Sequence, residues 1–151
     1  SAVVGTPTLV LIAVTTLTAC ISLGGAIYEA LVVDPFWPTR PGIIQSRNGG
    51  ISRVRFWLPV HTVFEVLLVV TVVLTWGDSE IGVPLLVALI SHAVMRIWSA
   101  FDLIPKAVEF ERKDPADVDE AAARRWIRRS MLRLPFSLVT CAGMLAALAI
   151  G

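Results

Sequence analysis

Long apolar runs alternate with short charged segments along this chain. Four runs, at about positions 8–33, 56–76, 81–105 and 132–151, contain few charged residues. Each reaches the roughly 20 residues that an α-helix needs to cross a bilayer core of about 30 Å. The pattern predicts an all-α protein, an integral membrane bundle of four antiparallel helices, with positions 1–151 forming a single domain.

The composition also indicates a membrane protein. Hydrophobic residues make up 56% of the 151 positions, charged residues make up 17%, and the mean hydropathy is +0.75. A soluble domain of ordinary composition carries about 25% charged residues, so that class is excluded. The first run has no basic segment before it and is longer than the core of a signal peptide, so we expect a true span there.

Basic residues lie on one side of the predicted spans. Twelve of the thirteen lysines and arginines fall within positions 34–55 and 106–133, and the remaining one is Arg96. The turn at positions 77–80 carries Asp78 and Glu80 but no basic residue. By the positive-inside rule, we expect a protein of the plasma (inner) membrane, with both basic loops in the cytoplasm and both termini outside.

The second basic segment also carries a helix signal. Asp114 and Pro115 suit an N-cap followed by the first helical position, and acidic residues then precede arginines up to position 129. We expect a cytoplasmic interfacial helix between the third and fourth spans, with its arginines as membrane anchors. Pro105 is expected to end the third span.

Six ionisable side chains lie inside the predicted spans, where each charge costs roughly 2.5–3.5 kcal/mol even on a lenient insertion scale. They are Glu29, His61, Glu65, His92, Arg96 and Asp102. Ionisable residues are rare in apolar segments because of this cost, and those that occur there mark functional positions. These residues are therefore the strongest indication of function in the chain.

Helical spacing brings several of these residues together. His61 and Glu65 are four apart in one span, and His92 and Arg96 are four apart in the next, so each pair shares a helix face. A short turn near Ser79 joins the two spans, so equal distance from it means equal depth. Glu65 and His92 lie 14 and 13 residues from Ser79, and His61 and Arg96 lie 18 and 17 residues away. We predict that Glu65 touches His92 and that one pocket contains all four side chains.

The first span can contribute to the same pocket. Glu29 and Tyr28 lie near its end, at about the level of His61, and Gly24 and Gly25 would let a neighbouring helix approach closely. We predict a polar cavity in the cytoplasmic half of the bundle, which a lipophilic molecule enters from the bilayer.

Several kinds of chemistry would suit such a cavity. A transition metal such as iron, zinc, manganese or copper could bind to a mixed nitrogen and oxygen set, namely Glu29, His61, Glu65 and His92. Without a metal, a buried carboxyl and a histidine could act as acid and base. The other uses are proton or solute transport and a structural network, in which Glu65 pairs with His92 and Arg96 pairs with Glu29 or Asp102. A haem between the two histidines is less favoured, because their levels differ by about 7 Å of helix rise.

Short motifs resemble those of the anthrone-oxygenase-like family of small four-span membrane proteins. They are GGAIYE at positions 24–29, DPFWP at 34–38, and RIWSAF at 96–101 followed by IP at 104–105. The resemblance implies a membrane-embedded oxidase or oxygenase that acts on polycyclic aromatic phenols. The spacing of His61 and Glu65 is also similar to that of emopamil-binding-protein-like sterol isomerases, which implies double-bond isomerisation by acid–base chemistry.

We therefore expect a membrane enzyme of the oxidase or oxygenase type, acting on a lipophilic substrate. Its His and Glu residues would bind a metal or take the phenolic proton, and Arg96 would stabilise the resulting oxyanion. The catalytic candidates are Glu29, His61, Glu65, His92 and Arg96, and the substrate-binding candidates are Tyr28, Trp57, Trp98, Ser99 and Asp102. The expected partners are the lipid bilayer and a lipophilic small molecule, and not nucleic acid. An isomerase, a non-enzymatic lipophile-binding module and a proton-coupled transport module are the alternatives.

Overall fold

The computed structural model describes residues 4–151, and over that range it contains helices and no strands. Four continuous helical rods are each long and apolar enough to cross a membrane: Thr6–Val33, Val54–Leu74, Ser79–Arg112 and Glu120–Ile150. The prediction of an all-α fold with four helices of spanning length is confirmed.

Three of the rods are built from more than one helical segment. The first consists of α1 (Thr6–Tyr28) and a π-helical turn (Glu29–Val33). The second is α2 alone (Val54–Leu74). The third consists of α3 (Ser79–Trp98), a π-helical turn (Ser99–Leu103) and α4 (Ile104–Arg112). The fourth consists of α5 (Glu120–Met131) and α6 (Leu134–Ile150), and short 3-10 turns lie in the connections at Pro41–Ile44, Ser46–Asn48 and Pro115–Asp117.

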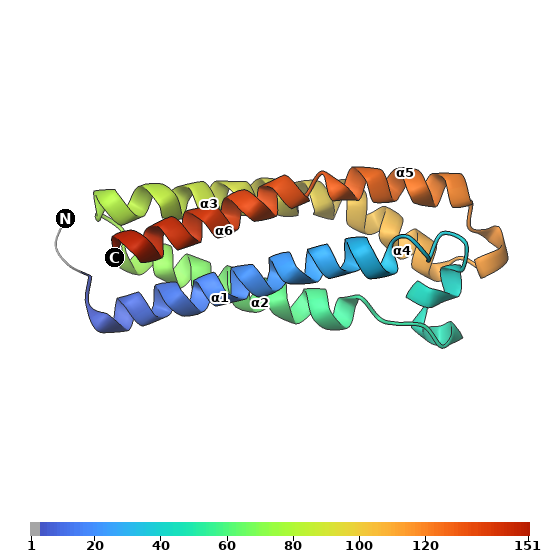
Figure 1. Ribbon diagram of the computed structural model, residues 1–151, viewed down its shortest axis with the longest axis horizontal. Helices are drawn as coiled ribbons and strands as arrows, with labels where there is room; N and C mark the ends of the chain where they lie inside the picture. Colours follow the sequence, from blue (N-terminus) through green and yellow to red (C-terminus); the bar gives the residue numbers. More distant parts are fainter. Residues whose placement is uncertain (1–3) are drawn as a thin grey trace.

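The rods pack as an antiparallel bundle, in which α1 contacts α2 and α6, and α6 also packs on α3 (Figure 1). The turn between α2 and α3 uses Gly77 at a φ of 97°, a conformation that favours glycine. The Asp78 side chain then caps α3 by accepting hydrogen bonds from two backbone amides. The centre of the bundle is filled by apolar side chains that include Ile12, Phe64, Leu68, Leu85 and Met144.

Glycines set two of the interhelical distances. A Cβ added at Gly143 would lie 2.7 Å from the carbonyl oxygen of Pro84 and 3.1 Å from the Cβ of Ala88, so α6 and α3 are in close backbone contact there. A Cβ added at Gly25 would lie 2.3 Å from the Phe56 ring, so this glycine makes room for a side chain of α2 and not for the predicted close approach of a neighbouring backbone. The neighbouring Gly24 faces open space.

A second core lies at the charged end of the bundle, by which we mean segment 34–53 together with α4 and α5. Trp37 is fully buried, and its ring centroid lies 5.4 Å from that of Phe110 and 6.1 Å from that of Trp126. The Gln45 amide donates hydrogen bonds to the carbonyls of Phe110 (3.0 Å) and Lys113 (2.8 Å). Segment 34–53 therefore packs against the end of α4 and supplies partners for its terminal carbonyl groups.

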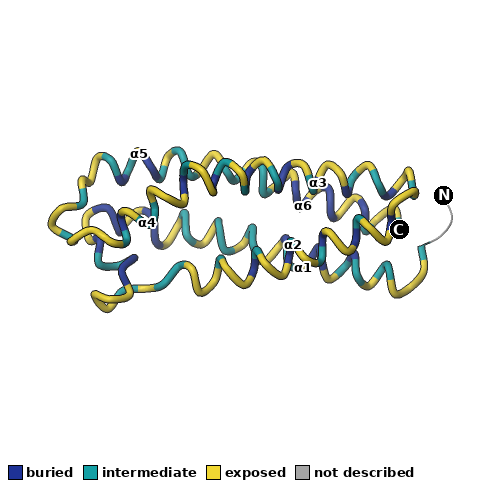
Figure 2. Tube along the Cα trace, turned by 180° about the vertical axis from the view of Figure 1, so that it is seen from behind, coloured by how far each residue is buried: buried dark blue, intermediate teal, exposed yellow. Residues whose placement is uncertain are grey.

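Apolar side chains cover the outer faces of the rods, where exposed positions recur along each helix (Figure 2). The third rod has 34 residues and is about 51 Å long at ~1.5 Å per residue. A bilayer core is only about 30 Å thick, so the charged end extends beyond the length that such a core can cover.

Two details of the third and fourth rods differ from the prediction. Pro105 does not end the third helix, which continues to Arg112. The proline lies in the first turn of α4, directly after a π-helical turn that changes the hydrogen-bond register, so its missing N–H is tolerated. Asp114 caps only a short 3-10 turn, and Asp119 is the N-cap of α5. Helix α5 continues roughly in line with α6 (Figure 1).

Candidate functional site

Glu65 on α2 is bound by two donors from α3. Its Oε2 atom lies 2.7 Å from His92 Nε2 and 2.8 Å from Arg96 Nε. The predicted contact between Glu65 and His92 is therefore confirmed. The predicted pairing of Arg96 with Glu29 or Asp102 is wrong. Side chains in a helix lean toward its N-terminus, so Arg96 reaches back along α3 to the level of Glu65.

His61 lies one turn from Glu65 on the same face of α2. Its ring centroid is 5.8 Å from that of His92 and 5.2 Å from that of Trp57, on which it stacks at an interplanar angle of 24°. The Nδ1 atom of His61 is buried and has no hydrogen-bond partner among the described residues. An unsatisfied buried polar atom costs about 1–3 kcal/mol, so this Nδ1 atom is suited to a partner other than the described residues.

We call His61, Glu65 and His92 the His–Glu–His cluster. One potential ligand atom from each residue lies within 4.8 Å of those from the other two. The cluster contains two imidazoles and one carboxylate, which is a donor set suited to a first-row transition metal. Glu29, the fourth residue of the predicted metal set, does not belong to this cluster.

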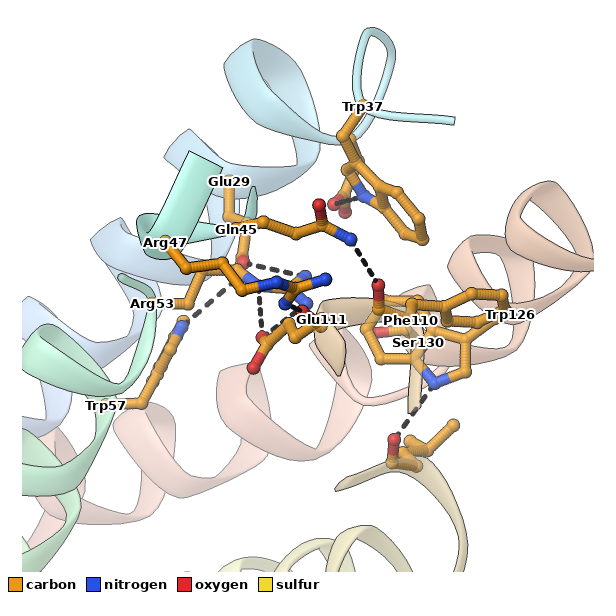
Figure 3. A network of polar contacts seen from close by, with 12 residues as sticks. Glu29, Trp37, Gln45, Arg47, Arg53, Trp57, Phe110, Glu111, Trp126 and Ser130 are labelled. Carbon is orange, nitrogen blue, oxygen red and sulfur yellow. Dashed lines mark hydrogen bonds and ion pairs between the residues drawn. The ribbon is translucent and has the colours of Figure 1, made fainter. Parts of the chain in front are cut away.

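Glu29 instead belongs to a second cluster at the charged end, which we call the Arg53 cluster: Glu29, Arg53, Trp57 and Glu111. Arg53 donates to Glu111 Oε1 at 2.8 Å, and its Nη1 lies 3.5 Å from Glu29 Oε1. Glu29 Oε2 also accepts a hydrogen bond from Trp57 Nε1 at 3.1 Å. Figure 3 shows these side chains converging from separate segments of the chain. Trp57 links the two clusters, because its ring also stacks on His61.

Asp34 lies beside the Arg53 cluster and is buried. It accepts a hydrogen bond from Trp37 Nε1 at 3.1 Å. Burial and, to a lesser extent, the neighbouring Glu29 carboxylate raise the pKa of Asp34 to about 6, although the Trp37 hydrogen bond and the charges of Arg53 and Arg133 act in the opposite direction. Asp34 is therefore a carboxyl group that can change its charge near neutral pH.

A cavity of about 270 Å³ lies between the two clusters. All four rods contribute to its wall, which is mostly apolar. His61 and Arg96 line it on the side of the His–Glu–His cluster, but Glu65 and His92 do not, so the prediction that one pocket contains all four side chains is wrong. The other charged lining residues are Glu29, Asp34, Arg53, Glu111 and Arg133. Its size is close to the lower end, about 300 Å³, of the usual range for ligand pockets. Such a space suits a small ring compound better than a long-chain lipid.

Of the five residues predicted to bind substrate, only Trp57 lines this cavity. Tyr28 is 61% exposed on the outside of α1. Trp98 donates to Asp102, and Asp102 also pairs with Arg129, so these two side chains are engaged in a separate contact. Ser99 is buried and accepts a hydrogen bond from Arg133 at 3.2 Å, which makes it a support for a lining residue.

Two arginines in the cavity wall, Arg53 and Arg133, are not among the predicted catalytic, substrate-binding or metal-binding residues. Arg53 has an 8% exposed side chain, with its guanidinium 5.7 Å and 5.6 Å from the ring centroids of Trp37 and Trp126. Arg133 donates to Ser99 and Ser130. Both arginines were counted among the loop residues that set membrane orientation. The signal that could have revealed them is their position next to the ends of α2 and α6, where a side chain can turn inward.

No family model, no curated protein and no solved structure matches this chain. The resemblance to the anthrone-oxygenase-like family therefore stays a prediction.

Proposed function

We propose that the protein is a membrane-embedded enzyme that binds a lipophilic phenol in the cavity and oxidises it with dioxygen. The observation that carries this proposal is the cavity itself, which has mostly apolar walls but places His61 and Arg96 on one side. A lipophilic ring fits the apolar wall, and the two polar side chains suit its hydroxyl group. The size of the cavity favours a compact ring system as the substrate.

The side chains have distinct roles in this proposal. The His61 imidazole accepts the phenolic proton as a general base. The Arg96 guanidinium stabilises the phenolate that forms, since a fixed cation in a site of low polarity strongly favours developing negative charge. His92 positions Glu65 through their 2.7 Å contact, and Glu65 in turn holds Arg96 at 2.8 Å. Trp57 fixes the ring of His61 by stacking on it.

We further propose that the apolar rods lie in a membrane and that the charged end faces the cytoplasm. The apolar outer surface and the four rods of spanning length support insertion. The concentration of basic residues at one end supports this orientation. The substrate then reaches the cavity from the bilayer, where a lipophilic phenol is concentrated.

A double-bond isomerase is the second candidate. It is favoured by His61, which lines the cavity beside the hydrogen-bonded pair of Glu65 and His92 and can pass a proton between two carbon atoms of one substrate without any oxidant. The two functions differ in their use of dioxygen. An isomerase converts its substrate equally well in air and under nitrogen.

The test is phenol-dependent oxygen uptake by the purified protein in lipid nanodiscs, with a tricyclic hydroxyanthrone as the probe. In the expected reaction, the methylene carbon loses two hydrogens and gains one oxygen atom, and the second oxygen atom leaves as water. We expect uptake in the wild type and a loss of at least about 10²-fold in Arg96→Met, in line with removal of one oxyanion donor. Conversion that continues under nitrogen would favour the isomerase, and the absence of conversion in both conditions would contradict the proposal.

Two tryptophans provide a matched pair of variants. Trp57 lines the cavity, and Trp98 lies on α3 but does not line it. Trp57→Phe should weaken binding of the probe, whereas Trp98→Phe should leave its binding unchanged. Equal effects of the two substitutions would argue against this cavity as the binding site.

A further inference from the structure

We propose that His61, Glu65 and His92 bind one divalent first-row transition metal ion. The ion would supply the redox chemistry of the oxidation, so its role rests on the proposed function. His61 would then be a ligand of the ion, and it would act as the general base only in protein without the ion, because a metal-bound imidazole cannot also accept the phenolic proton. Its binding can be tested without any turnover.

The backbone positions of the three residues suit a shared ion. His61 and Glu65 are one turn apart on the same face of α2, and His92 faces them from the antiparallel α3. Their ligand atoms lie within 4.8 Å of one another. Ligands at neighbouring positions around a metal are about 3 Å apart when each bond is ~2.1 Å long. These separations would have to shorten by about 1–2 Å for the three atoms to share an ion.

The unsatisfied atom of His61 is an independent indication of a ligand. Its Nδ1 is buried and has no hydrogen-bond partner among the residues that the structure describes. The histidine is held in place by stacking on Trp57 and by ring contact with His92, and not by polar bonds. A histidine that is positioned by ring contacts, and whose Nδ1 has no polar partner among the described residues, suits the role of a ligand.

The donor set selects the class of ion. Two neutral imidazoles and one carboxylate favour iron(II), manganese(II), cobalt(II) or zinc(II), and such a set leaves further coordination positions open. Calcium and magnesium need more oxygen ligands than a single carboxylate provides. His61 lines the cavity, so an ion bound to it lies at the cavity wall, next to the space proposed for the phenol.

Arg96 opposes the cation, because its Nε donates to the same oxygen of Glu65 that contacts His92. Its side chain is 31% exposed and borders the cavity, so it has room to turn away from Glu65 when a cation binds. We therefore expect Arg96→Met to bind the metal at least as tightly as the wild type. This variant separates metal binding from the role of Arg96 in stabilising a phenolate.

The experiment is a titration of chelator-stripped protein in detergent with cobalt(II), followed by the visible absorption bands of the bound ion. We expect one ion per chain. His61→Phe and Glu65→Gln should each weaken binding by at least about tenfold. His61→Phe is the sharpest variant, because it keeps an aromatic ring on Trp57 and breaks no hydrogen bond of the Glu65 network. Glu29→Gln is the control, since Glu29 lines the same cavity but lies outside the cluster.

Failure of wild-type protein to bind cobalt, or equal binding by wild type, His61→Phe and Glu65→Gln, would overturn the metal site. Size-exclusion profiles of every variant establish that the fold is retained. The two proposals fail separately. Oxygen uptake by stripped protein in the presence of chelator would contradict a role for the metal and support the proposed oxidation. Cobalt binding without any oxygen uptake would support the metal site and contradict the proposed oxidation.

Discussion

Glu65 is the residue on which the polar centre of the bundle depends. It accepts from His92 and Arg96 through a single carboxylate oxygen, and it lies one turn from His61. Loss of either partner leaves a polar group without its bond in an apolar span, which is costly. The energetic consequences of substitutions in this group should therefore depend on one another.

We predict that Glu65→Gln and His92→Ala have non-additive effects on the free energy of unfolding. Residues that share one hydrogen-bond network show interaction energies of about 0.5–3 kcal/mol. The measurement is a double-mutant cycle from reversible unfolding in mixed micelles. Effects of the two substitutions that simply add would count against a shared network.

Asp34 lies outside the spanning rods, and its buried environment raises its pKa. Its pKa is about 6 in the folded protein and 3.8 without the burial and charge effects. The folded state therefore holds the proton more tightly than the unfolded state. The stability from this difference is fully present below pH 3.8 and is lost as the pH rises through 6.

Replacing Asp34 with Asn should remove this pH dependence. Asn keeps an oxygen that accepts the Trp37 hydrogen bond but never becomes charged. We expect Asp34→Asn to gain roughly 2–3 kcal/mol relative to wild type between pH 4 and pH 7. The measurement is the unfolding midpoint of both proteins across this range, with exposed Asp114→Asn as the control. A constant difference between wild type and Asp34→Asn at every pH would contradict the account.

At the scale of elements, the contact between α3 and α6 depends on glycine. A Cβ at Gly143 would meet backbone and side chain of α3 at 2.7 Å and 3.1 Å, and neither neighbour is a flexible chain end. We predict that Gly143→Ala destabilises the bundle by about 1–3 kcal/mol. Gly24→Ala, where nothing lies within 4 Å, is the control and should be neutral or slightly stabilising. Thermal unfolding that ranks the two variants in the opposite order would refute this packing.

An element could be predicted where the interactions that form it are local in the sequence, and it could not where they join distant parts of the chain. The depth match of Glu65 and His92 needs only a short turn at Gly77 and a regular rise, so it was predictable from residue counting. The continuation of the third helix through Pro105 was not, because it depends on a π-helical turn that leaves no mark in the hydrophobic pattern. The inward position of Arg53 depends on Trp37 and Trp126, which come from distant parts of the chain.

For the whole molecule, the distribution of charge predicts one orientation in the membrane. Ser79 and Asn48 are exposed at opposite ends of the bundle. In a background with both native cysteines replaced by alanine, we predict that a cysteine at position 79 reacts with an impermeant reagent added outside intact cells. A cysteine at position 48 should react only after the membrane is opened. Labelling of a cysteine at position 48 by reagent added outside intact cells would contradict this orientation and indicate the opposite one.

We propose that the polar cluster between α2 and α3 serves a site and is not needed to hold the bundle together. Apolar replacement of a whole buried ion pair is often neutral or stabilising, whereas loss of one partner is costly. The most direct measurement is binding of the hydroxyanthrone probe to a variant with His61, Glu65, His92 and Arg96 all replaced by Leu or Met, with its unfolding midpoint recorded in detergent. We predict a folded protein whose unfolding midpoint is at least that of wild type and which no longer binds the probe. A variant that fails to fold, or one that binds the probe as wild type does, would contradict it.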